Sequence, residues 1–539
     1  MPPKESIREI RINQNPFSAE FDRLGFGRIE ILTKPGSDKF HGTGFYDISD
    51  GSFDARNPFL NVMPDFRTQR FGGNVSGPLG KHASFFVDVE RRNIDDNDII
   101  FADAFTNAGL PPSSNFFPTP QRLTTASPRV DWQLGANNTL SMRYSYWDSQ
   151  TAAKFGSEFS LPGNQDKSDT VTHTAQLVET AILSPKVVNE THFEYRRDDA
   201  YLTAFSQAPQ LNVAGSFIQG GSGTGISSNL TNYYELQNYT TVSQGAHSIK
   251  FGIRVRANQL TDTSAQNANG TYLYSGITAP VLDANFNPVL DPTTGLAQTI
   301  KLTSLQQYQR GQQLAAAGLT PSQISALGGG ASQFSITQTN NPLQALSQVD
   351  LGGFVQDDWR VAPNFTLSTG LRYETQTNIH DWSDFAPRVA IAWSPKLSSS
   401  TGRPKTVIRA GFGMFYQRFD DTNVLTTERY NGVNQIGYLI QDPTTLYPVI
   451  PSITGLSGTS ASRYTIDPSL RAPYLIQGVV GVDQQLTKRT TLSVNYTNTR
   501  GVHQYRTIDI NAPLPGTFVV GQPNSGDRPY GDIGDIYQY

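Results

Sequence analysis

The sequence contains no cysteine, which excludes disulfide bonds, cysteine-bound zinc and thiol catalysis. It has no run of eighteen or more apolar residues, so hydropathy predicts no transmembrane helix. The first residues, Met1 to Ser6, lack the basic start and apolar core of a secretory signal. Either the protein is not exported, or the chain begins within a longer one.

Neither sign of charge predominates, because 42 basic and 46 acidic residues leave a net charge of -4. Basic clusters of the kind that phosphate contacts need are absent, which argues against a nucleic-acid partner. Hydrophobic residues make up only 37%, yet there are 30 Phe, 23 Tyr and 47 Gly. This combination is typical of strands with one wet face rather than of a disordered chain.

The common catalytic motifs are also missing. The sequence has no HExxH, no GxSxG and no GxxxxGK[ST]. Its seven histidines are scattered without the i, i+4 spacing of a helical metal pair. We therefore predict no catalytic residue, no metal site and no bound cofactor, and we expect that the protein is not an enzyme.

Alternation of apolar and hydrophilic residues dominates the chain from His41 onward, in about fifteen segments with a period of two. In the clearest one, Ile249, Phe251, Ile253 and Val255 alternate with Ser248, Lys250, Gly252, Arg254 and Arg256. Residues 365–374 and 408–417 repeat the pattern, with Phe415 as an exception. With their flanks, several segments reach about nine to eleven residues, enough to cross a bilayer at a tilt.

The connections between these segments alternate in length. Tight polar turns lie at 134–139, 183–186, 243–247, 361–365 and 486–490. Long loops rich in Asn, Gly, Ser, Thr and Pro occupy 93–127, 199–229, 258–348 and 419–473, and residues 303–327 within the third can form one or two short helices. Short turns at one end and long loops at the other predict an all-β, antiparallel transmembrane barrel.

The alternation assigns residues to the two faces of such a barrel. The lumen-facing candidates are Arg254, Arg256, Arg372, Glu374 and Arg409. They can contact an anionic solute or a plug inside the barrel, but pairing with lumen carboxylates is the more expected role for most of them. Trp359, just before a tight turn, is either an interfacial aromatic anchor or an ordinary packed tryptophan.

The two ends of the chain depart from this pattern. Residues 7–12 and 28–33 read as two short strands that cannot form a core alone, as in the remnant of a small domain. After Tyr505 the sequence becomes rich in Pro and Gly. Residues 533–539 are only a weak candidate for a closing strand.

Several motifs, in order, carry a resemblance to a known family. The first is Gly27, Ile29, Ile31, Thr33, Lys34, Gly36, Ser37, Asp38, Phe40, His41 and Gly42. The others are Asp54–Asn57, Gln69–Pro78, Phe354–Val361, Leu367–Tyr373 and Phe385–Arg388. Together they resemble the TonB-dependent outer-membrane receptors, in particular the Oar-like group, over nearly the whole chain.

The resemblance implies a barrel of about twenty-two strands around an N-terminal plug, in the outer membrane of a Gram-negative cell. Residues 1–40 would be the end of the plug and 41–539 the barrel. The junction would comprise Gly27, Thr33, Lys34, Gly36, Phe40, His41 and Gly42. The expected partners are outer-membrane lipid, an unknown solute and the TonB complex. We expect the signal peptide, the TonB-contacting segment, most of the plug and the last barrel strands to be missing from this chain.

Two other classes of function share the alternation. A passive porin would have the same wall but no need for the strand at 28–34 or its continuation into the first wall strand. A β-rich adhesin of the sandwich kind should have shorter strands and apolar inner faces. A role as an envelope-organising protein stays open. Siderophore, cobalamin, glycan and peptide all remain open as the solute.

Overall fold

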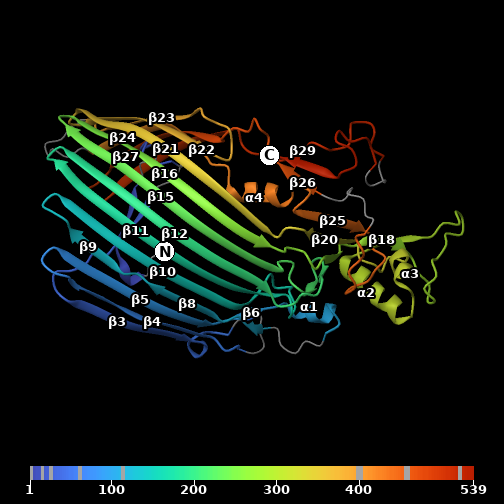
Figure 1. Cartoon of the computed structure of the whole chain (residues 1–539). Coiled ribbons are helices and arrows are strands. Elements are labelled where there is room, and N and C mark those ends of the chain that lie inside the picture. The colour runs from blue at the N-terminus through green and yellow to red at the C-terminus, as the bar shows by residue number, and fades with distance from the viewer. Residues whose placement is uncertain are drawn as a thin grey trace.

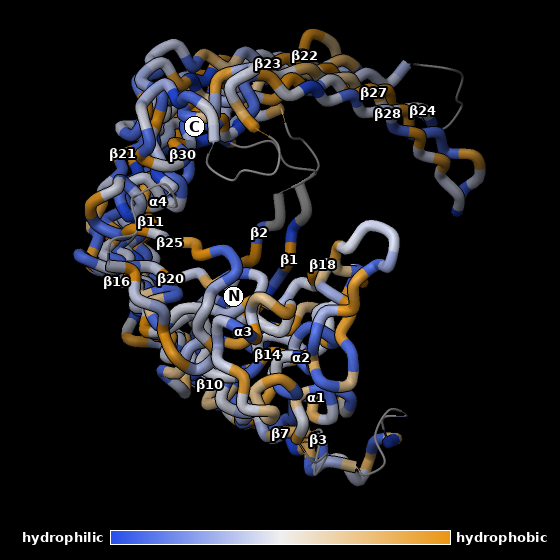
Figure 2. The backbone as a smooth tube through the Cα atoms, turned by 90° about the vertical axis from the view of Figure 1, so that its right-hand side faces the viewer, coloured by the Kyte–Doolittle hydropathy of each residue, from blue (hydrophilic) through white to orange (hydrophobic). Residues whose placement is uncertain are grey.

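The computed structural model describes residues 4–13, 17–22, 28–56, 58, 63–110, 116–395, 405–454, 462–519 and 525–539. Most of the strand residues among them belong to one large antiparallel sheet of long, tilted strands (Figure 1). Seen along the strands, the sheet curves into an open C (Figure 2). Among the described residues, no helix is both long and apolar enough to cross a membrane.

The large sheet has 16 strands in the described part of the chain. In chain order they are β3 (His41–Asp50), β4 (Arg67–Pro78), β5 (Ala83–Asp95), β8 (Gln121–Ala126), β9 (Arg129–Gln133), β10 (Asn138–Phe155), β11 (Gln165–Ser184), β12 (Val187–Ala204), β15 (Ile226–Gln244), β16 (His247–Ser264), β21 (Leu343–Ala362), β22 (Phe365–Gln376), β23 (Asp384–Trp393), β24 (Thr406–Tyr416), β27 (Tyr474–Gln485) and β28 (Thr491–Val502). β8 and β9 share one position between β5 and β10. Within the described residues, β3 and β28 each have one neighbour.

The alternation in the sequence accounts for the two faces of the sheet. In β16, Phe251 and Ile253 lie on the convex face and are 46% and 52% exposed. Lys250 and Arg254, one residue away in the chain, contact groups on the concave side. Successive side chains of a strand point to opposite faces, so an apolar exterior and a polar interior follow directly. The predicted all-β, antiparallel barrel fold is thus confirmed.

The expected difference between the two ends is present, but the strands are longer than predicted. Gln244 and His247 flank a tight turn in which Gly245 has a φ of +63°. At the opposite end β15 and β16 stay paired as far as Ser227 and Ser264. The predicted loops 199–229 and 258–348 are therefore too wide. Polar residues occupy both faces of these strand ends, so the alternation stops although the hydrogen-bonded ladder continues.

The long connections fold into a second, smaller sheet, the loop-end sheet. It consists of β13 (Gln210–Val213), β14 (Phe217–Gly220), β17 (Thr271–Tyr274), β20 (Gln333–Thr339) and β25 (Gln435–Gln441). Phe217, Tyr272 and Phe334 are fully buried in a cluster that includes Tyr308 of α2 (Ser304–Ala316). The second helix, α3 (Pro321–Ala326), packs against α2. Thr303 and Thr320 cap the two helices with capping boxes. The short helices predicted within 303–327 are confirmed.

The remaining elements lie in connections or after β28. They are η2 (Gly51–Phe53), β6 (Asn97–Ile99), α1 (Ala102–Asn107), β7 (Phe116–Pro118), β18 (Ile277–Pro280), β19 (Thr299–Leu302), α4 (Asp421–Arg429), β26 (Ser462–Thr465), β29 (Ile508–Asp509) and β30 (Asp535–Gln538). β30 pairs with β26 and β29. The segment 533–539 therefore does not close the large sheet.

The beginning of the chain forms a hairpin that lies within the concave side of the sheet (Figure 2). It contains η1 (Lys4–Ser6), β1 (Ile7–Asn13) and β2 (Arg28–Thr33), and the two strands pair antiparallel. We call residues 4–13, 17–22 and 28–34 the lumen hairpin. Its two ends contact opposite parts of the wall, and these contacts define the candidate site.

Candidate functional site

The base of the lumen hairpin is bonded to β9. Nη1 of Arg129 donates to the carbonyl oxygen of Thr33 at 3.2 Å and to its hydroxyl at 2.9 Å. The backbone N–H of Lys34 donates to the carbonyl oxygen of Ser6 at 2.8 Å. These bonds fix the point at which the hairpin leaves the lumen and approaches the wall.

The junction that follows is packed closely against the first wall strands. The backbone N–H of Gly36 donates to Asp131 at 3.1 Å, and a Cβ at position 36 would overlap Ser84, so this approach requires glycine. Phe40 is 71% exposed, with its ring centroid 6.3 Å from that of Phe85. His41 and Gly42 open β3 opposite Ser76 and Val75. Gly27, also predicted at the junction, lies outside the described residues.

The other end of the hairpin reaches β22 and β24. Here the segment Phe17–Asp22, which we call the docked segment, lies against two glycines of the wall. A Cβ at Gly370 would come within 2.7 Å of Cβ of Ala19, and one at Gly411 would overlap the Phe17 ring. The rings of Phe17 and Phe415 pack with centroids 6.2 Å apart. Phe415 breaks the alternation of β24 because it receives this apolar contact inside the lumen.

The backbone of the docked segment is held by wall side chains. The Oε1 atom of Gln356 accepts from the N–H of Ala19 at 2.7 Å and from the hydroxyl of Ser18 at 3.0 Å. Nη1 of Arg388 donates to the carbonyl oxygens of Ser18 and Phe21, both at 2.6 Å. These bonds give the segment a single position on β21 and β23.

Arg372 of β22 adds a further contact from beneath the segment. Its Nη1 lies 3.3 Å from the carbonyl oxygens of both Ala19 and Glu20. Its Nε donates to Glu374 at 2.6 Å. Arg372 is only 1% exposed, so its charge depends on these oxygens for compensation.

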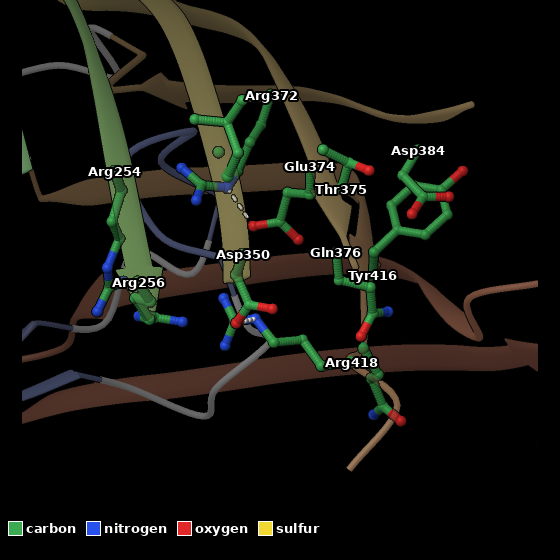
Figure 3. A pocket seen from close by; sticks show the side chains of 13 residues that line it. Arg254, Arg256, Asp350, Arg372, Glu374, Thr375, Gln376, Asp384, Tyr416 and Arg418 are labelled. Atoms are coloured by element: carbon green, nitrogen blue, oxygen red, sulfur yellow. Dashed lines mark hydrogen bonds and ion pairs between the residues drawn. The ribbon is translucent and has the colours of Figure 1, made fainter. Parts of the chain in front are cut away.

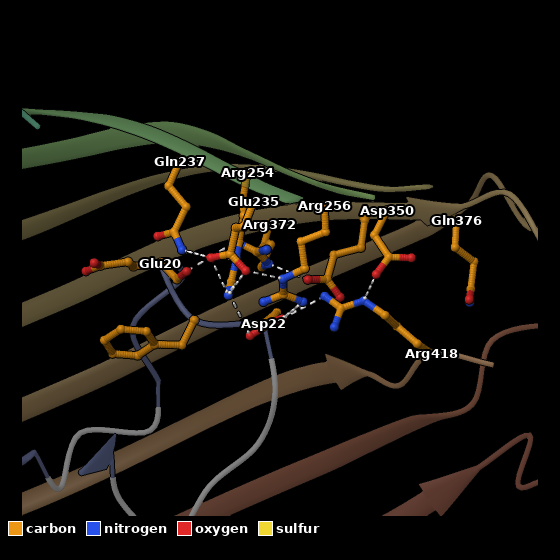
Figure 4. Close-up of polar contacts among 12 residues, drawn as sticks. Glu20, Asp22, Glu235, Gln237, Arg254, Arg256, Asp350, Arg372, Gln376 and Arg418 are labelled. Carbon is orange, nitrogen blue, oxygen red and sulfur yellow. Dashed lines mark hydrogen bonds and ion pairs between the residues drawn. The ribbon is translucent and has the colours of Figure 1, made fainter. Parts of the chain in front are cut away.

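Asp22 is the centre of the charged contacts (Figure 4). Its carboxylate lies 3.3 Å from Arg254, 2.7 Å from Arg256 and 2.7 Å from Arg418. Burial raises the pKa of Asp22, but the three guanidinium groups outweigh it and hold the pKa well below its ordinary value. The contribution of this ionised group to docking is therefore present above the ordinary carboxyl pKa and is lost only far below it.

Wall carboxylates share the same arginines. Glu235 lies 2.9 Å from Arg254 and 2.8 Å from Arg256, and Asp350 lies 2.6 Å from Arg418. A separate ion pair joins Lys250 to Glu20 of the docked segment at 2.6 Å. We call the wall residues that contact the segment the cradle: Lys250, Arg254, Arg256, Gln356, Arg372, Arg388 and Arg418.

Two cavities adjoin the cradle. Figure 3 shows the first, between Arg254, Arg256 and Arg372 on one side and Tyr416 and Arg418 on the other. The second has a volume of about 360 Å³ and is lined by Asp22, Arg256 and Arg418 together with residues of the long connection after β24. Space for a small ligand is therefore present next to Asp22.

The structure brings together only some of the residues predicted from the sequence. Arg254, Arg256, Arg372 and Glu374 lie in or beside the cradle, whereas Arg409 pairs with Asp483 away from it. Trp359 is 39% exposed at the short-turn end of β21, and its ring stacks on His247 with centroids 5.3 Å apart.

Arg388, Arg418, Lys250 and Asp22 were not predicted as site residues. Arg388 ends the family-like motif Phe385–Arg388, and Lys250 lies on the hydrophilic face of its strand, so both carried a signal. Asp22 and Arg418 lie outside the alternating segments, and only the folded chain shows that they meet. Among the described residues, no group of three or more His, Asp or Glu is arranged to hold a metal ion.

Curated and solved relatives agree with this architecture. The TonB-dependent transporter Oar of Myxococcus xanthus is 21% identical over 97% of this chain and 57% of its own length. The outer membrane transporter YddB of Escherichia coli matches with a TM-score of 0.61 at 13% identity, over 99% of this chain and 59% of its own. A mutant ferric enterobactin receptor, PfeA of Pseudomonas aeruginosa, matches with a TM-score of 0.58 at 13% identity, over 100% and 62%.

These relatives are named as transporters and receptors, not as enzymes, and the chain spans about three fifths of their length. They confirm the resemblance to TonB-dependent outer-membrane receptors and, through Oar, to the Oar-like group. The family model described as outer membrane beta barrel domain matches residues 32–109, 100–381 and 378–539. The chain therefore belongs to the outer membrane beta barrel domain family, whose place is the outer membrane of Gram-negative cells.

Proposed function

We propose that the complete protein is an energy-coupled transporter, driven by the TonB complex, that takes up a solute across the outer membrane. In this proposal the lumen hairpin is the end of the plug, and the docked segment must leave the cradle before a solute passes. The observation that carries it is the attachment of Phe17–Asp22 to the inner wall by six cationic side chains and Gln356.

The same attachment disfavours a passive porin. A pore that is always open gains nothing from a chain segment held across its lumen, whereas a gated channel needs a contact that is specific and can be broken. Ion pairs and hydrogen bonds of this kind are directional, so they define one closed position. The resemblance to a named TonB-dependent transporter supports the gated alternative.

The two ends of the large sheet have different roles in this proposal. The end with tight turns faces the periplasm, and the end with the loop-end sheet faces outside, as in other barrels of this kind. The loop-end sheet receives the solute, and the cavity beside Asp22 adjoins the cradle. Lipid contacts the exposed apolar convex faces, and Trp359 anchors one rim.

Labelling of a cysteine in the docked segment tests the proposal without knowledge of the solute. Ser18→Cys is close to isosteric and adds a cysteine to a sequence that has none. The variant is made in the full-length protein in its native cells, with any cysteine outside residues 1–539 replaced by serine. We expect a membrane-impermeant maleimide to label it faster, by roughly a factor of three or more, in cells with TonB than in cells without it.

The control is Leu296→Cys, at a position in the long connection before α2 that is 71% exposed. Its labelling rate should be the same in both strains. Equal rates for Ser18→Cys with and without TonB, at unchanged protein level, would contradict the proposed function.

A further inference from the structure

We infer that the cradle is a binding surface for oxyanions, and that the transported solute is an anion whose carboxylate or phosphate oxygens take the places of the docked segment's oxygens. This inference rests on the proposed function, because the cradle opens only when the segment leaves. It adds a class of solute, which neither the description of the family nor the name of the Oar transporter specifies.

The docked segment meets the cradle mainly through oxygen atoms. Two carboxylates, those of Glu20 and Asp22, accept from Lys250 and from three arginines. Carbonyl oxygens accept from Arg372 and Arg388. Gln356 makes the remaining contacts, as an acceptor. The segment thus presents a row of oxygens to a row of cationic donors, as a polycarboxylate or a phosphorylated solute would.

The charge on the wall is not balanced without the segment. The cationic side chains of the cradle are Lys250, Arg254, Arg256, Arg372, Arg388 and Arg418. The wall carboxylates paired with them are Glu235, Asp350 and Glu374. Three positive charges therefore remain when Glu20 and Asp22 leave, and an anion is the species that restores neutrality.

Arg388 has hydrogen-bond donors that the docked segment does not use. The residue is 3% exposed, and one of its faces lies over the Phe415 ring at 4.2 Å. Its Nε and Nη2 have no hydrogen-bond partner among the described residues. A buried guanidinium with unused donors is costly unless an acceptor reaches it, so the site is suited to further oxygen atoms.

Release of the segment and entry of an anion are therefore coupled. Departure alone removes the carbonyl partners of Arg372 and Arg388, and the oxygens of an anion can replace them. An anion in the cavity beside Asp22 can contact Arg256 and Arg418 while the segment is still attached elsewhere. Binding of the solute then lowers the free energy needed to move the segment.

The residues that line the second cavity show where a preference for anions arises. Asp420 and Asp421 line it together with Asp350, so its outer part does not favour anions. The preference for an anion arises at the cradle itself, where cationic groups outnumber carboxylates two to one.

The test uses purified full-length protein with Ser18→Cys, where no TonB is present. Citrate and inorganic phosphate serve as probes, each compared with chloride at equal ionic strength. We expect at least one oxyanion to raise the rate of maleimide labelling by roughly a factor of three or more over chloride, because it displaces the segment. Acceleration by citrate alone identifies carboxylate chemistry, by phosphate alone phosphate chemistry, and by both a general oxyanion site.

Two arginine variants show whether the effect belongs to the cradle. Arg256→Gln should abolish the oxyanion effect, whereas Arg409→Gln should keep it, since Arg409 faces the lumen outside the cradle and pairs with Asp483. If Arg256→Gln releases the segment completely, calorimetry gives the answer instead: citrate should bind more tightly to Gly411→Val, which displaces the segment, than to the wild type.

The inference is overturned if neither oxyanion exceeds chloride and citrate binds no more tightly to Gly411→Val, or if Arg256→Gln and Arg409→Gln respond alike. A negative result here combined with TonB-dependent labelling in cells rejects the anion and keeps the transporter. Acceleration by oxyanions without any effect of TonB keeps the oxyanion site and rejects TonB-driven transport.

Discussion

Replacing Gly411 by valine should displace the docked segment from the cradle. A Cβ at this position overlaps the ring of Phe17. The ring cannot easily shift along the strand, because Phe415 of the same strand packs beside it. Overpacking of this kind costs about 1–3 kcal/mol, and here the cost falls on docking because valine itself suits a strand. Labelling of Ser18→Cys should therefore become roughly 5- to 150-fold faster.

Gly478→Val is the matched control for this substitution. Gly478 lies on β27, the neighbour of β24, and a Cβ there comes no closer than 4.0 Å to another atom. The same side chain is thus added to the same sheet without touching the docked segment. If Gly411→Val labels at the rate of Gly478→Val while both proteins fold, the segment is not held by the contact between Phe17 and the wall.

Sequence alone is sufficient for the large sheet because one physical constraint acts on every strand. The convex face contacts an apolar phase and the concave face contacts polar groups, so Phe251 and Arg254 can be assigned to faces without knowledge of their neighbours. The assignment fails where that constraint ends. Beyond Leu260 in β16 both faces are polar. The pairing with β15 continues there although apolar and polar residues no longer alternate in the sequence.

The loop-end sheet could not be predicted for a different reason. Its strands are four to seven residues long and come from three separate connections, and β13 pairs in parallel with β17 across some sixty residues of chain. Short strands with distant partners leave no pattern within a window of sequence. Only its helices, with Thr303 and Thr320 as capping residues, carried a local signal.

The sequence predicted the type of residue in the candidate site but not the full set of residues that meet there. Alternation placed Arg254, Arg256 and Arg372 in the lumen, and pairing with carboxylates was the expected role. It did not reveal that the partner of two of them is Asp22, because that contact joins the hairpin to a wall strand more than 200 residues away. No sequence pattern around Asp22 or these arginines indicates that they form ion pairs, because the contact exists only in the folded chain.

Removal of the charge at Asp22 should have the largest effect of any single change in the docked segment. Asp22→Asn keeps the shape of the side chain but leaves Arg254, Arg256 and Arg418 with only Glu235 and Asp350 as carboxylate partners. Because each arginine keeps one partner, we expect docking to weaken by about 2–4 kcal/mol rather than by the full cost of an isolated buried charge. Hydrogen exchange of the Ala19 amide, which donates to Gln356 in the docked state, reports this directly.

The exchange rate at Ala19 should rise roughly 30- to 1000-fold in Asp22→Asn, because exchange requires the segment to leave Gln356. Glu20→Gln provides the comparison, since Lys250 is the one ion-pair partner of Glu20 in the described part of the chain and both side chains are partly exposed. Its effect should be about 1 kcal/mol or less. Equal effects of the two substitutions would mean that the arginines do not hold the segment through Asp22, and that the apolar contacts at Gly370 and Gly411 are sufficient to dock it.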